Sequence, residues 1–122
     1  MRQDYIGVDF DGTLAYYERG DIYRNGITYT GPPIEPMVKH VKQLIASGET
    51  VKIFTARVFD NPPGVVTAIE DWCLQHIGQV LEITNIKEPS CKYFIDDRAR
   101  QVINNTGIFV EDLVDQSRLP QN

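Results

Sequence analysis

The stretch YIGVDFDGTL, residues 5–14, decides the fold of this 122-residue chain. Residues 5–10 are mostly apolar, and an acidic, glycine-containing segment follows them. A short apolar run of this kind is typical of a buried central strand that ends in a loop. The stretch therefore predicts a strand with Asp9 at its carboxyl end, followed by a tight turn at Gly12.

Residues 16–33 have a different composition. They contain four tyrosines and several glycines, and the pair Asn25-Gly26 is typical of a tight turn. This pattern predicts a hairpin or small flap inserted after the first strand. Its tyrosines would either stack on a base or sugar ring of a ligand or pack the hairpin onto the rest of the domain.

Helical and strand-like segments alternate along the rest of the chain. Apolar spacing predicts a helix from Ile34 to Gly48. It also predicts a second helix after residues 60–63, whose buried face is formed by Val66, Ile69, Trp72, Cys73 and Ile77. Further predicted elements are strands at 51–54, 80–84 and 92–95, a short helix from Arg98 and a last strand near 108–110.

Such alternation indicates right-handed crossovers and a parallel sheet. We therefore expect one α/β domain over residues 1–122, with a three-layer, Rossmann-like architecture in which helices cover both faces of the sheet. At this length the chain has room for one hydrophobic core.

Polar residues follow three of the predicted strands. Asp9 and Asp11 follow the first, Thr55 the second, and Asp96 with Asp97 the strand at 92–95. Ligands bind beyond the carboxyl ends of strands in such sheets. Carboxylates gathered there repel one another unless a cation binds them, and oxygen ligands suit Mg²⁺. The sequence thus predicts a magnesium site formed by Asp9, Asp11, Asp96 and Asp97.

Three motifs at these strand ends resemble those of the haloacid-dehalogenase superfamily. Asp9-Phe10-Asp11-Gly12-Thr13-Leu14 is similar to its first motif, Phe54-Thr55-Ala56-Arg57 to its second, and Ile95-Asp96-Asp97-Arg98 to its fourth. The resemblance spans most of the chain. It implies the superfamily's type of Rossmann-like fold and a magnesium-dependent phosphohydrolase that acts on phosphomonoesters.

The resemblance also implies a role for each matching residue. Asp9 would attack phosphorus and form an aspartyl-phosphate, and Asp11 would act first as acid and then as base. Thr55, with the backbone N–H groups around Ala56, would bind a phosphate oxygen. Independently of the resemblance, the position of Arg57 directly after Thr55 makes it a candidate substrate contact, and Arg98 would either pair with a neighbouring carboxylate or contact the substrate. Mg²⁺ would lie between Asp9, the Asp11 carbonyl and the aspartate pair; whether Asp96 or Asp97 is the direct ligand stays open.

The superfamily's third motif is a single lysine, for which the sequence offers two candidates. Lys87 follows the third predicted strand, where its ammonium could reach the site. Lys92 begins the next strand at the opposite end of the sheet. We therefore expect Lys87 to bind the phosphate and to neutralise Asp9, with Lys92 as the alternative.

Many members of the superfamily carry an inserted cap domain, for which this chain has no room. An open site suits a large phosphorylated substrate or enclosure by another subunit of a homo-oligomer. Nucleotides, sugar phosphates, a nucleic-acid 3′ end and a phosphoprotein all remain candidate substrates. A binding or regulatory module without turnover is the alternative function. A receiver domain is disfavoured because its acidic pair precedes the phosphorylated aspartate, whereas here the pair comes last.

Composition narrows the partners and the compartment. Twelve Lys and Arg against seventeen Asp and Glu give a formal charge of −5, which does not indicate general attraction to nucleic acid. No signal segment or long apolar span is visible, so we expect no membrane partner. Cys73 and Cys91 fit neither a zinc spacing nor a disulfide framework, which predicts reduced thiols and a cytoplasmic location.

Overall fold

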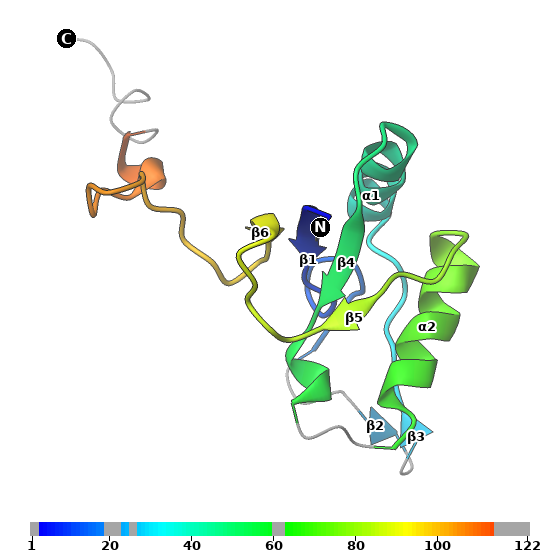
Figure 1. Cartoon of the computed structure of the whole chain (residues 1–122). Helices are drawn as coiled ribbons and strands as arrows, with labels where there is room; N and C mark the ends of the chain where they lie inside the picture. The colour runs from blue at the N-terminus through cyan, green and yellow to red at the C-terminus, as the bar shows by residue number, and fades with distance from the viewer. Residues whose placement is uncertain (1–2, 19–22, 25–26, 60–62, 114–122) are drawn as a thin grey trace, which may run out of the picture.

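The computed structural model describes residues 3–18, 23–24, 27–59 and 63–113 (Figure 1). Its centre is a four-stranded parallel sheet in the order β5-β4-β1-β6. The elements are β1 (Tyr5–Val8), β2 (Tyr23–Arg24), β3 (Ile27–Thr28), α1 (Glu35–Ala46), β4 (Val51–Phe54), η1 (Ala56–Val58), α2 (Val65–His76), β5 (Ile83–Thr84) and β6 (Cys91–Ile95). The α/β class and the parallel sheet predicted from the sequence are confirmed.

β1 lies between β4 and β6, and all four of its residues are buried. This position explains its apolar, β-branched composition, because a strand inside a parallel sheet is covered on both faces. The chain order of the strands also places Asp9, Thr55 and Asp96 directly after β1, β4 and β6, at one edge of the sheet. Topology alone therefore gathers these polar residues.

α1 begins and ends where the sequence predicts. Pro36 lies in the first turn, where a missing backbone N–H costs nothing, and Gly48 adopts a φ of +97° just beyond the last turn. Val38 and Val41 are the buried residues of this helix and pack into the core. The helix thus fixes the geometry of the crossover from β1 to β4.

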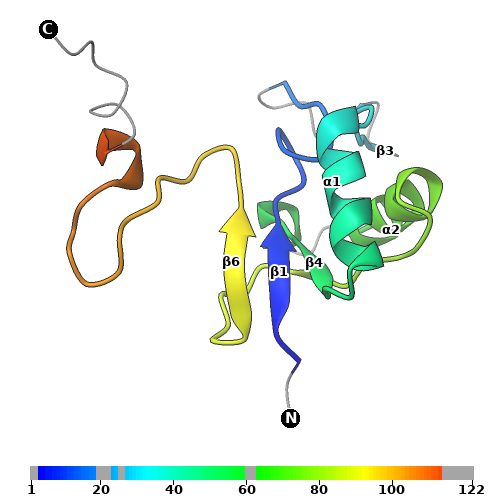
Figure 2. The same ribbon diagram turned by 90° about the horizontal axis from the view of Figure 1, so that it is seen from above.

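α1 and α2 cover the same face of the sheet. Ile6 is paired with Val51 and Val8 with Ile53, so these side chains point to one face. The hydrophobic core joins them to residues of both helices, which lie to one side of the sheet in Figures 1 and 2. The prediction of helices on both faces is therefore wrong for the described residues.

The opposite face carries aromatic and charged side chains. Phe54 and Phe94 make an edge contact, with ring centroids 4.8 Å apart, and the Lys52 ammonium lies 4.2 Å from the centroid of the Tyr5 ring. Glu88 accepts a 3.1 Å hydrogen bond from the Tyr5 hydroxyl. The segment between β5 and β6 therefore covers part of this face without forming a helix.

Several boundaries differ from the prediction. In α2, Val65 rather than Val66 is buried, because Val65 lies one helical turn, four residues, before Ile69 and so shares its face. β5 comprises two residues only. No helix starts at Arg98, and residues 108–110 do not join the sheet: Phe109 forms an isolated antiparallel bridge with Val102.

The predicted hairpin after β1 is described in part. β2 and β3 pair antiparallel, whereas the predicted turn at Asn25-Gly26 lies outside the described residues. The segment that returns to α1 is fixed by a 2.8 Å hydrogen bond from the Trp72 indole N–H to the Gly31 carbonyl. A side chain at Gly31 would collide with the Tyr16 carbonyl oxygen, so this close approach of two backbone segments requires glycine.

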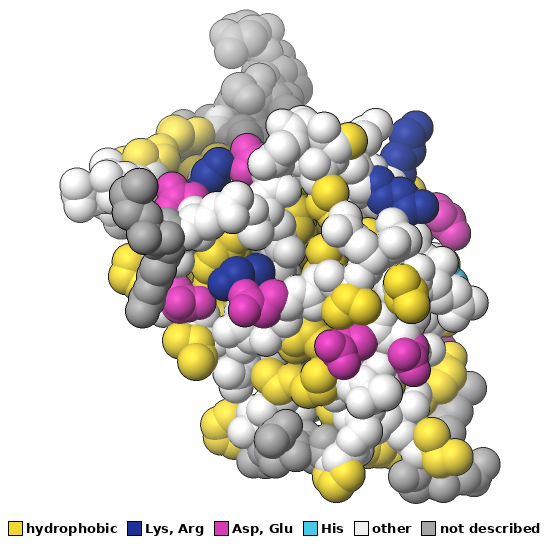
Figure 3. Space-filling model, turned by 45° about the vertical axis from the view of Figure 1, so that its right-hand side comes forward, with side chains coloured by type: hydrophobic (Ala, Val, Ile, Leu, Met, Phe, Trp, Pro, Cys, Tyr) yellow, Lys and Arg dark blue, Asp and Glu magenta, His cyan; other side chains and the backbone are white. Residues whose placement is uncertain are grey.

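Charge is dispersed on the face shown in Figure 3. Its Lys and Arg side chains are few, and they lie among Asp and Glu rather than in a broad patch. Among the described residues, none of the helices combines the length and the apolar character needed to cross a lipid bilayer.

Candidate functional site

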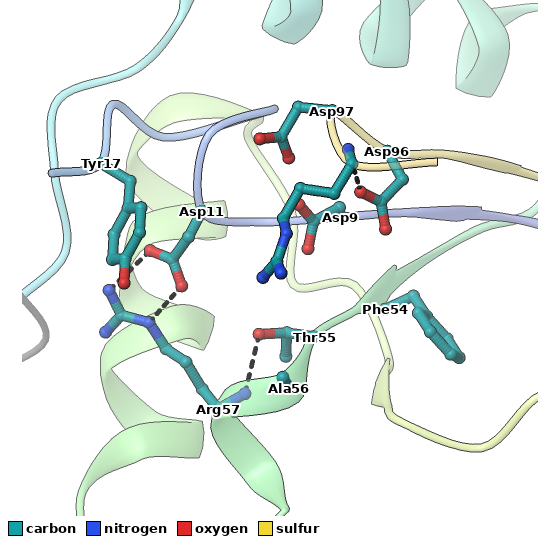
Figure 4. A pocket seen from close by; sticks show the side chains of 10 residues that line it. Asp9, Asp11, Tyr17, Phe54, Thr55, Ala56, Arg57, Asp96 and Asp97 are labelled. Carbon is teal, nitrogen blue, oxygen red and sulfur yellow. Dashed lines mark hydrogen bonds and ion pairs between the residues drawn. The ribbon is translucent and has the colours of Figure 1, made fainter. Parts of the chain in front are cut away.

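A cavity of about 510 Å³ opens at the carboxyl ends of β1, β4 and β6 (Figure 4). It is lined by Asp9, Asp11, Tyr17, Phe54, Thr55, Ala56, Arg57, Asp96, Asp97 and Arg98. The structure thus brings together every residue predicted for the site except Lys87. The positions come from three strand ends that are far apart in the sequence.

The turn that follows β1 is closed by backbone hydrogen bonds and contains Gly12. The Phe10 carbonyl accepts hydrogen bonds from the N–H groups of Leu14 and Ala15, which closes a tight turn. Gly12 has a φ of +83°, and a Cβ there would lie 2.7 Å from an Asp97 carboxylate oxygen. Glycine is required at this position for both its backbone conformation and the approach of Asp97.

Asp9, Asp96 and Asp97 form an acidic cluster in which one carboxylate oxygen of each lies within 4.8 Å of the others. The Thr13 hydroxyl is 3.3 Å from Asp9 Oδ2 and 3.1 Å from Asp97 Oδ1, so it donates to one of them. The Asp97 backbone N–H donates in turn to this hydroxyl. Thr13, which is buried, therefore connects the first strand end to the last.

The cluster has an electrostatic cost. Burial, the contact with Asp97 and the negative charge of Asp96 together raise the pKa of Asp9 from 3.8 to about 7. A divalent cation beside these oxygens would remove that repulsion and favour the ionised carboxylate. The donor set, three carboxylates around one point, fits a hard cation such as Mg²⁺.

Asp11 lies outside this cluster and faces Arg57. The guanidinium donates to both Asp11 oxygens, over 2.6 Å from Nε and 2.7 Å from Nη2. Its Nη1 donates over 2.7 Å to the Tyr29 carbonyl of the segment after β3. Figure 4 shows Arg57 turned toward Asp11 and Tyr17 rather than toward Asp9. Arg57 therefore joins the second aspartate of the turn to the hairpin region.

Thr55 and Ala56 lie at the end of β4, across the cavity from Asp9. The Thr55 backbone N–H donates to the Thr84 carbonyl of β5, which fixes the strand end. The Thr55 hydroxyl accepts a 3.2 Å hydrogen bond from the Arg57 backbone N–H. Within the part of the chain that the structure describes, its hydroxyl hydrogen has no acceptor, so it could be donated to a ligand oxygen in the cavity.

The two candidate lysines lie away from the cavity. The Lys87 ammonium is 5.9 Å from the centroid of the Phe94 ring, on the face of the sheet that the helices leave uncovered. Lys92 forms a 2.8 Å ion pair with Glu49 at the other end of the sheet. The structure thus places neither lysine among the lining residues, although Lys87 is beside Phe94, which contacts the lining residue Phe54.

Three residues outside the predicted catalytic and metal-binding set line or support the site. Arg98 lines the cavity, and its backbone N–H donates to Asp96 Oδ1, which marks a tight turn after β6. Tyr17 lines the cavity as well, and Thr13 bridges two of the aspartates. The adjacency of Arg98 to the aspartate pair was the available signal for the first. The roles of the other two depend on side-chain directions that spacing does not reveal.

Comparison with known proteins supports the fold. No family model and no curated protein matches the chain. The chain is similar to a solved structure described as that of a conserved protein coded by a locus from Bacteroides thetaiotaomicron, with 21% sequence identity and a TM-score of 0.55. The match covers 97% of this chain and 94% of that one. At this identity the likeness shows the fold alone, an α/β domain built on a parallel sheet.

Proposed function

We propose that this protein is a magnesium-dependent phosphohydrolase that acts on phosphomonoesters, with Asp9 as the nucleophile. The observation that carries the proposal is the cluster of Asp9, Asp96 and Asp97, whose oxygens lie within 4.8 Å of one another in an open cavity beside Thr55. The resemblance of the three strand-end motifs to those of the haloacid-dehalogenase superfamily supports the same conclusion.

In the proposed reaction, an Asp9 oxygen attacks the phosphorus atom and the bond to the leaving oxygen breaks, so that an aspartyl-phosphate forms. Asp11 gives a proton to the leaving oxygen and then takes one from the water that hydrolyses the intermediate. When bound at Asp9, Asp96 and Asp97, Mg²⁺ would supply charge neutralisation for the aspartates and the phosphoryl group. Attack of that water on phosphorus breaks the bond to the Asp9 oxygen, which releases inorganic phosphate and restores the Asp9 carboxylate.

Arg57 constrains the acid step. Both Asp11 oxygens accept hydrogen bonds from its guanidinium, so a proton on Asp11 requires that one of these contacts opens. The third contact, to the Tyr29 carbonyl, joins this event to the hairpin after β1. We infer that the described segment around Tyr29, which belongs to the predicted flap, adjusts when substrate enters. The Arg57 guanidinium would then position Asp11. The backbone of Arg57, together with that of Ala56, would face the substrate.

The phosphate oxygens need donors on the side of the cavity opposite Asp9. The Thr55 hydroxyl and the backbone at Ala56 supply neutral donors. Arg98 supplies a positive charge: its guanidinium has no ion-pair partner among the residues that the structure describes. Lys87 remains our proposal for the second cation, which would reach the phosphate by turning from the Phe94 ring toward the cavity.

The openness of the site bears on the size of the substrate. No cap domain separates the cavity from solvent in the described residues, which suits a nucleotide, a sugar phosphate or a larger phosphorylated molecule. The same openness suits enclosure by a second subunit.

A specific observation favours a second candidate function. The Asp11 carboxylate, which the reaction needs as acid and base, is fully engaged by Arg57. A phosphate-binding or regulatory module of the same fold would keep such a pair permanently closed. Turnover separates the two functions.

The experiment measures phosphate release from p-nitrophenyl phosphate, nucleotides, sugar phosphates and 3′-phosphorylated oligonucleotides, with Mg²⁺ and with chelator. We expect metal-dependent release that Asp9→Asn reduces by at least about a thousandfold, because an amide is a far poorer nucleophile. Glu82→Gln, an exposed carboxylate at the other end of the sheet, is the matched control. No release from any substrate by folded, metal-bound protein would favour the binding module.

A further inference from the structure

The turn after β1 and the turn after β6 are joined through one side chain, that of Thr13. Its hydroxyl oxygen lies 3.1 Å from Asp97 Oδ1 and 3.3 Å from Asp9 Oδ2, and it accepts a 3.1 Å hydrogen bond from the Asp97 backbone N–H. A hydroxyl has one hydrogen, so it donates to one carboxylate at a time, and the shorter of the two distances is the one to Asp97. Thr13 therefore contacts Asp97 twice, at its backbone and at its carboxylate.

The position of the Thr13 hydroxyl is itself fixed. Thr13 is only 6% exposed, and its backbone N–H donates over 3.3 Å to the Phe10 carbonyl, which closes the turn after β1. A buried β-branched side chain has few rotamers open to it. The hydroxyl is thus a rigid part of this turn, whereas Asp97 follows a strand at the edge of the sheet.

A second hollow adjoins the acidic cluster. It has a volume of about 300 Å³, and its lining includes Thr13, Asp97 and two residues from the first turn of α1, Pro36 and Met37. Asp97 lines both this hollow and the larger cavity, whereas Asp9 lines the larger cavity alone. The Asp97 side chain therefore has space on two sides, one toward Asp9 and one toward the start of α1.

Repulsion favours a turn of Asp97 away from Asp9. Oxygens of Asp9, Asp96 and Asp97 lie within 4.8 Å of one another, and like charges at this separation repel. Within the described ranges of the chain, no lysine or arginine forms an ion pair with Asp97. A carboxylate that could turn freely would leave Asp9 for the second hollow. The hydrogen bond from Thr13 opposes that movement.

The neighbouring Asp96 is supported in another way. One of its oxygens accepts a 2.8 Å hydrogen bond from the Arg98 backbone N–H, so it is held within its own turn. The Asp97 carboxylate is held by a residue 84 positions away. Gly12 permits this approach, since a Cβ there would lie 2.7 Å from an Asp97 oxygen. Of the two aspartates, Asp97 is the one whose direction depends on the turn after β1.

We propose that Thr13 is a positioning residue for the magnesium ion: its hydroxyl turns the Asp97 carboxylate toward Asp9, so that the ligand set is assembled before the ion binds. Thr13 acts through Asp97 and does not itself bind the ion. A preformed set of ligands binds more tightly, because binding does not require Asp97 to turn back from the second hollow. This inference rests on the proposed function, which places Mg²⁺ at Asp9, Asp96 and Asp97.

The first experiment measures the affinity of the full chain for Mg²⁺ by titration calorimetry, with no substrate present. Thr13→Val keeps the shape of the side chain but removes the hydroxyl, and it should weaken binding by about 10- to 100-fold. Thr13→Ser restores the hydroxyl on a less restricted side chain and should bind within about threefold of wild type.

Thr106→Val is the matched control. The Thr106 hydroxyl also accepts a backbone N–H, that of Ile108, and donates to an oxygen, the Ile103 carbonyl. Thr106 lines neither the cavity nor the second hollow, so this variant should bind Mg²⁺ as wild type does.

The outcomes separate this inference from the proposed function. A folded Thr13→Val protein that binds Mg²⁺ as tightly as wild type would overturn the inference and leave the proposed function standing. Folded wild type that binds no Mg²⁺ would contradict both. Thermal unfolding in chelator shows which variants fold, and Thr13→Ala takes the place of Thr13→Val if the latter does not.

A second experiment tests whether Thr13 acts through Asp97. Mg²⁺ affinity is measured from the rise in unfolding temperature with Mg²⁺ concentration, which also detects weak binding. Added to Asp97→Ala, Thr13→Val should have little further effect, because the carboxylate that Thr13 positions is already gone. Added to Asp96→Ala, it should keep its full effect. Equal effects in the two backgrounds would show that Thr13 does not act through Asp97, and the inference would be wrong.

Discussion

Both ends of the sheet carry carboxylates, but only at the amino end are they paired with lysines. At the amino end, Lys52 pairs with Glu82 over 2.5 Å and lies 4.0 Å from Glu88, and Lys92 pairs with Glu49. At the carboxyl end, Asp9, Asp96 and Asp97 face one another without a lysine or arginine in an ion pair with them, as far as the described residues show. Carboxylates at the first end stabilise the fold, whereas those at the second repel.

Asp11 is the exception at the carboxyl end, and this contrast is informative. Its partner Arg57 is almost completely buried, with 2% of its side chain exposed, and makes three hydrogen bonds. The site thus contains one aspartate, Asp11, that is paired with an arginine of the chain. The other three, Asp9, Asp96 and Asp97, are left for a metal ion. That division matches the separation between an acid or base and a metal-bound nucleophile in the proposed reaction.

The largest expected effect comes from removing the fixed cation. Arg57→Met should lower the free energy of unfolding by about 2 to 4 kcal/mol, because it leaves the Asp11 carboxylate without its buried partner. Phosphate release should fall as well, since Asp11 loses its orientation. Urea denaturation and the substrate panel measure the two effects.

Arg57→Lys is the matched control for this change. It keeps the charge but loses the planar fork, so it should lie between wild type and Arg57→Met in both measurements. A stability loss below about 0.5 kcal/mol for Arg57→Met would mean that the pair contributes as little as an exposed ion pair. The contrast between the two kinds of aspartate would then be wrong.

The sequence reveals one part of this arrangement and not the other. The positions of Asp9, Thr55 and Asp96 follow from the order of apolar segments, since parallel strands deliver their next residues to a common edge. The pairing of Arg57 with Asp11 spans 46 positions and depends on side-chain directions, which periodicity does not encode. The sequence accordingly predicts Arg57 as a substrate contact and does not reveal its pairing with Asp11.

The same distinction explains the errors in the fold. α1 and β4 were predicted correctly because each has a strong apolar pattern and a clear end signal. The prediction of helices on both faces extended the alternation of strands and helices past β6, where the chain has too few apolar residues at helical spacing. In residues 98–113 the structure instead has an isolated antiparallel bridge between Val102 and Phe109.

A smaller effect tests whether the acidic cluster is destabilising. The pKa of Asp9 is raised to about 7 in the folded protein, so the folded state holds its proton more tightly than the unfolded chain. Stability from this group is complete below about pH 4 and is lost as the pH rises through 7. In chelator, Asp9→Asn should therefore be more stable than wild type at pH 8, by about 1 to 2 kcal/mol after allowance for solvent screening.

Thermal unfolding of both proteins at pH 4 and pH 8 measures this difference. We expect little or no advantage of Asp9→Asn at pH 4, where the wild-type carboxyl is protonated in the folded state and therefore adds no negative charge to the cluster. Saturating Mg²⁺ at pH 8 should reverse the order, because wild type gains the binding energy of the ion. An advantage that is equal at both pH values would show that repulsion among the aspartates is not its cause.

The smallest effect is expected at the balanced end. Lys52→Met keeps the apolar stem over the Tyr5 ring but removes the charge that faces Glu82 and Glu88. Because Glu82 is largely exposed, water screens the remaining charges, and the loss of stability should stay below about 1 kcal/mol with phosphate release unchanged. The loss should shrink further in 1 M salt, where exposed charges are screened within a few ångströms. A loss as large as that of Arg57→Met, or one that salt does not reduce, would mean that the amino end also depends on a buried ion pair. The proposed contrast between the two ends of the sheet would then be wrong.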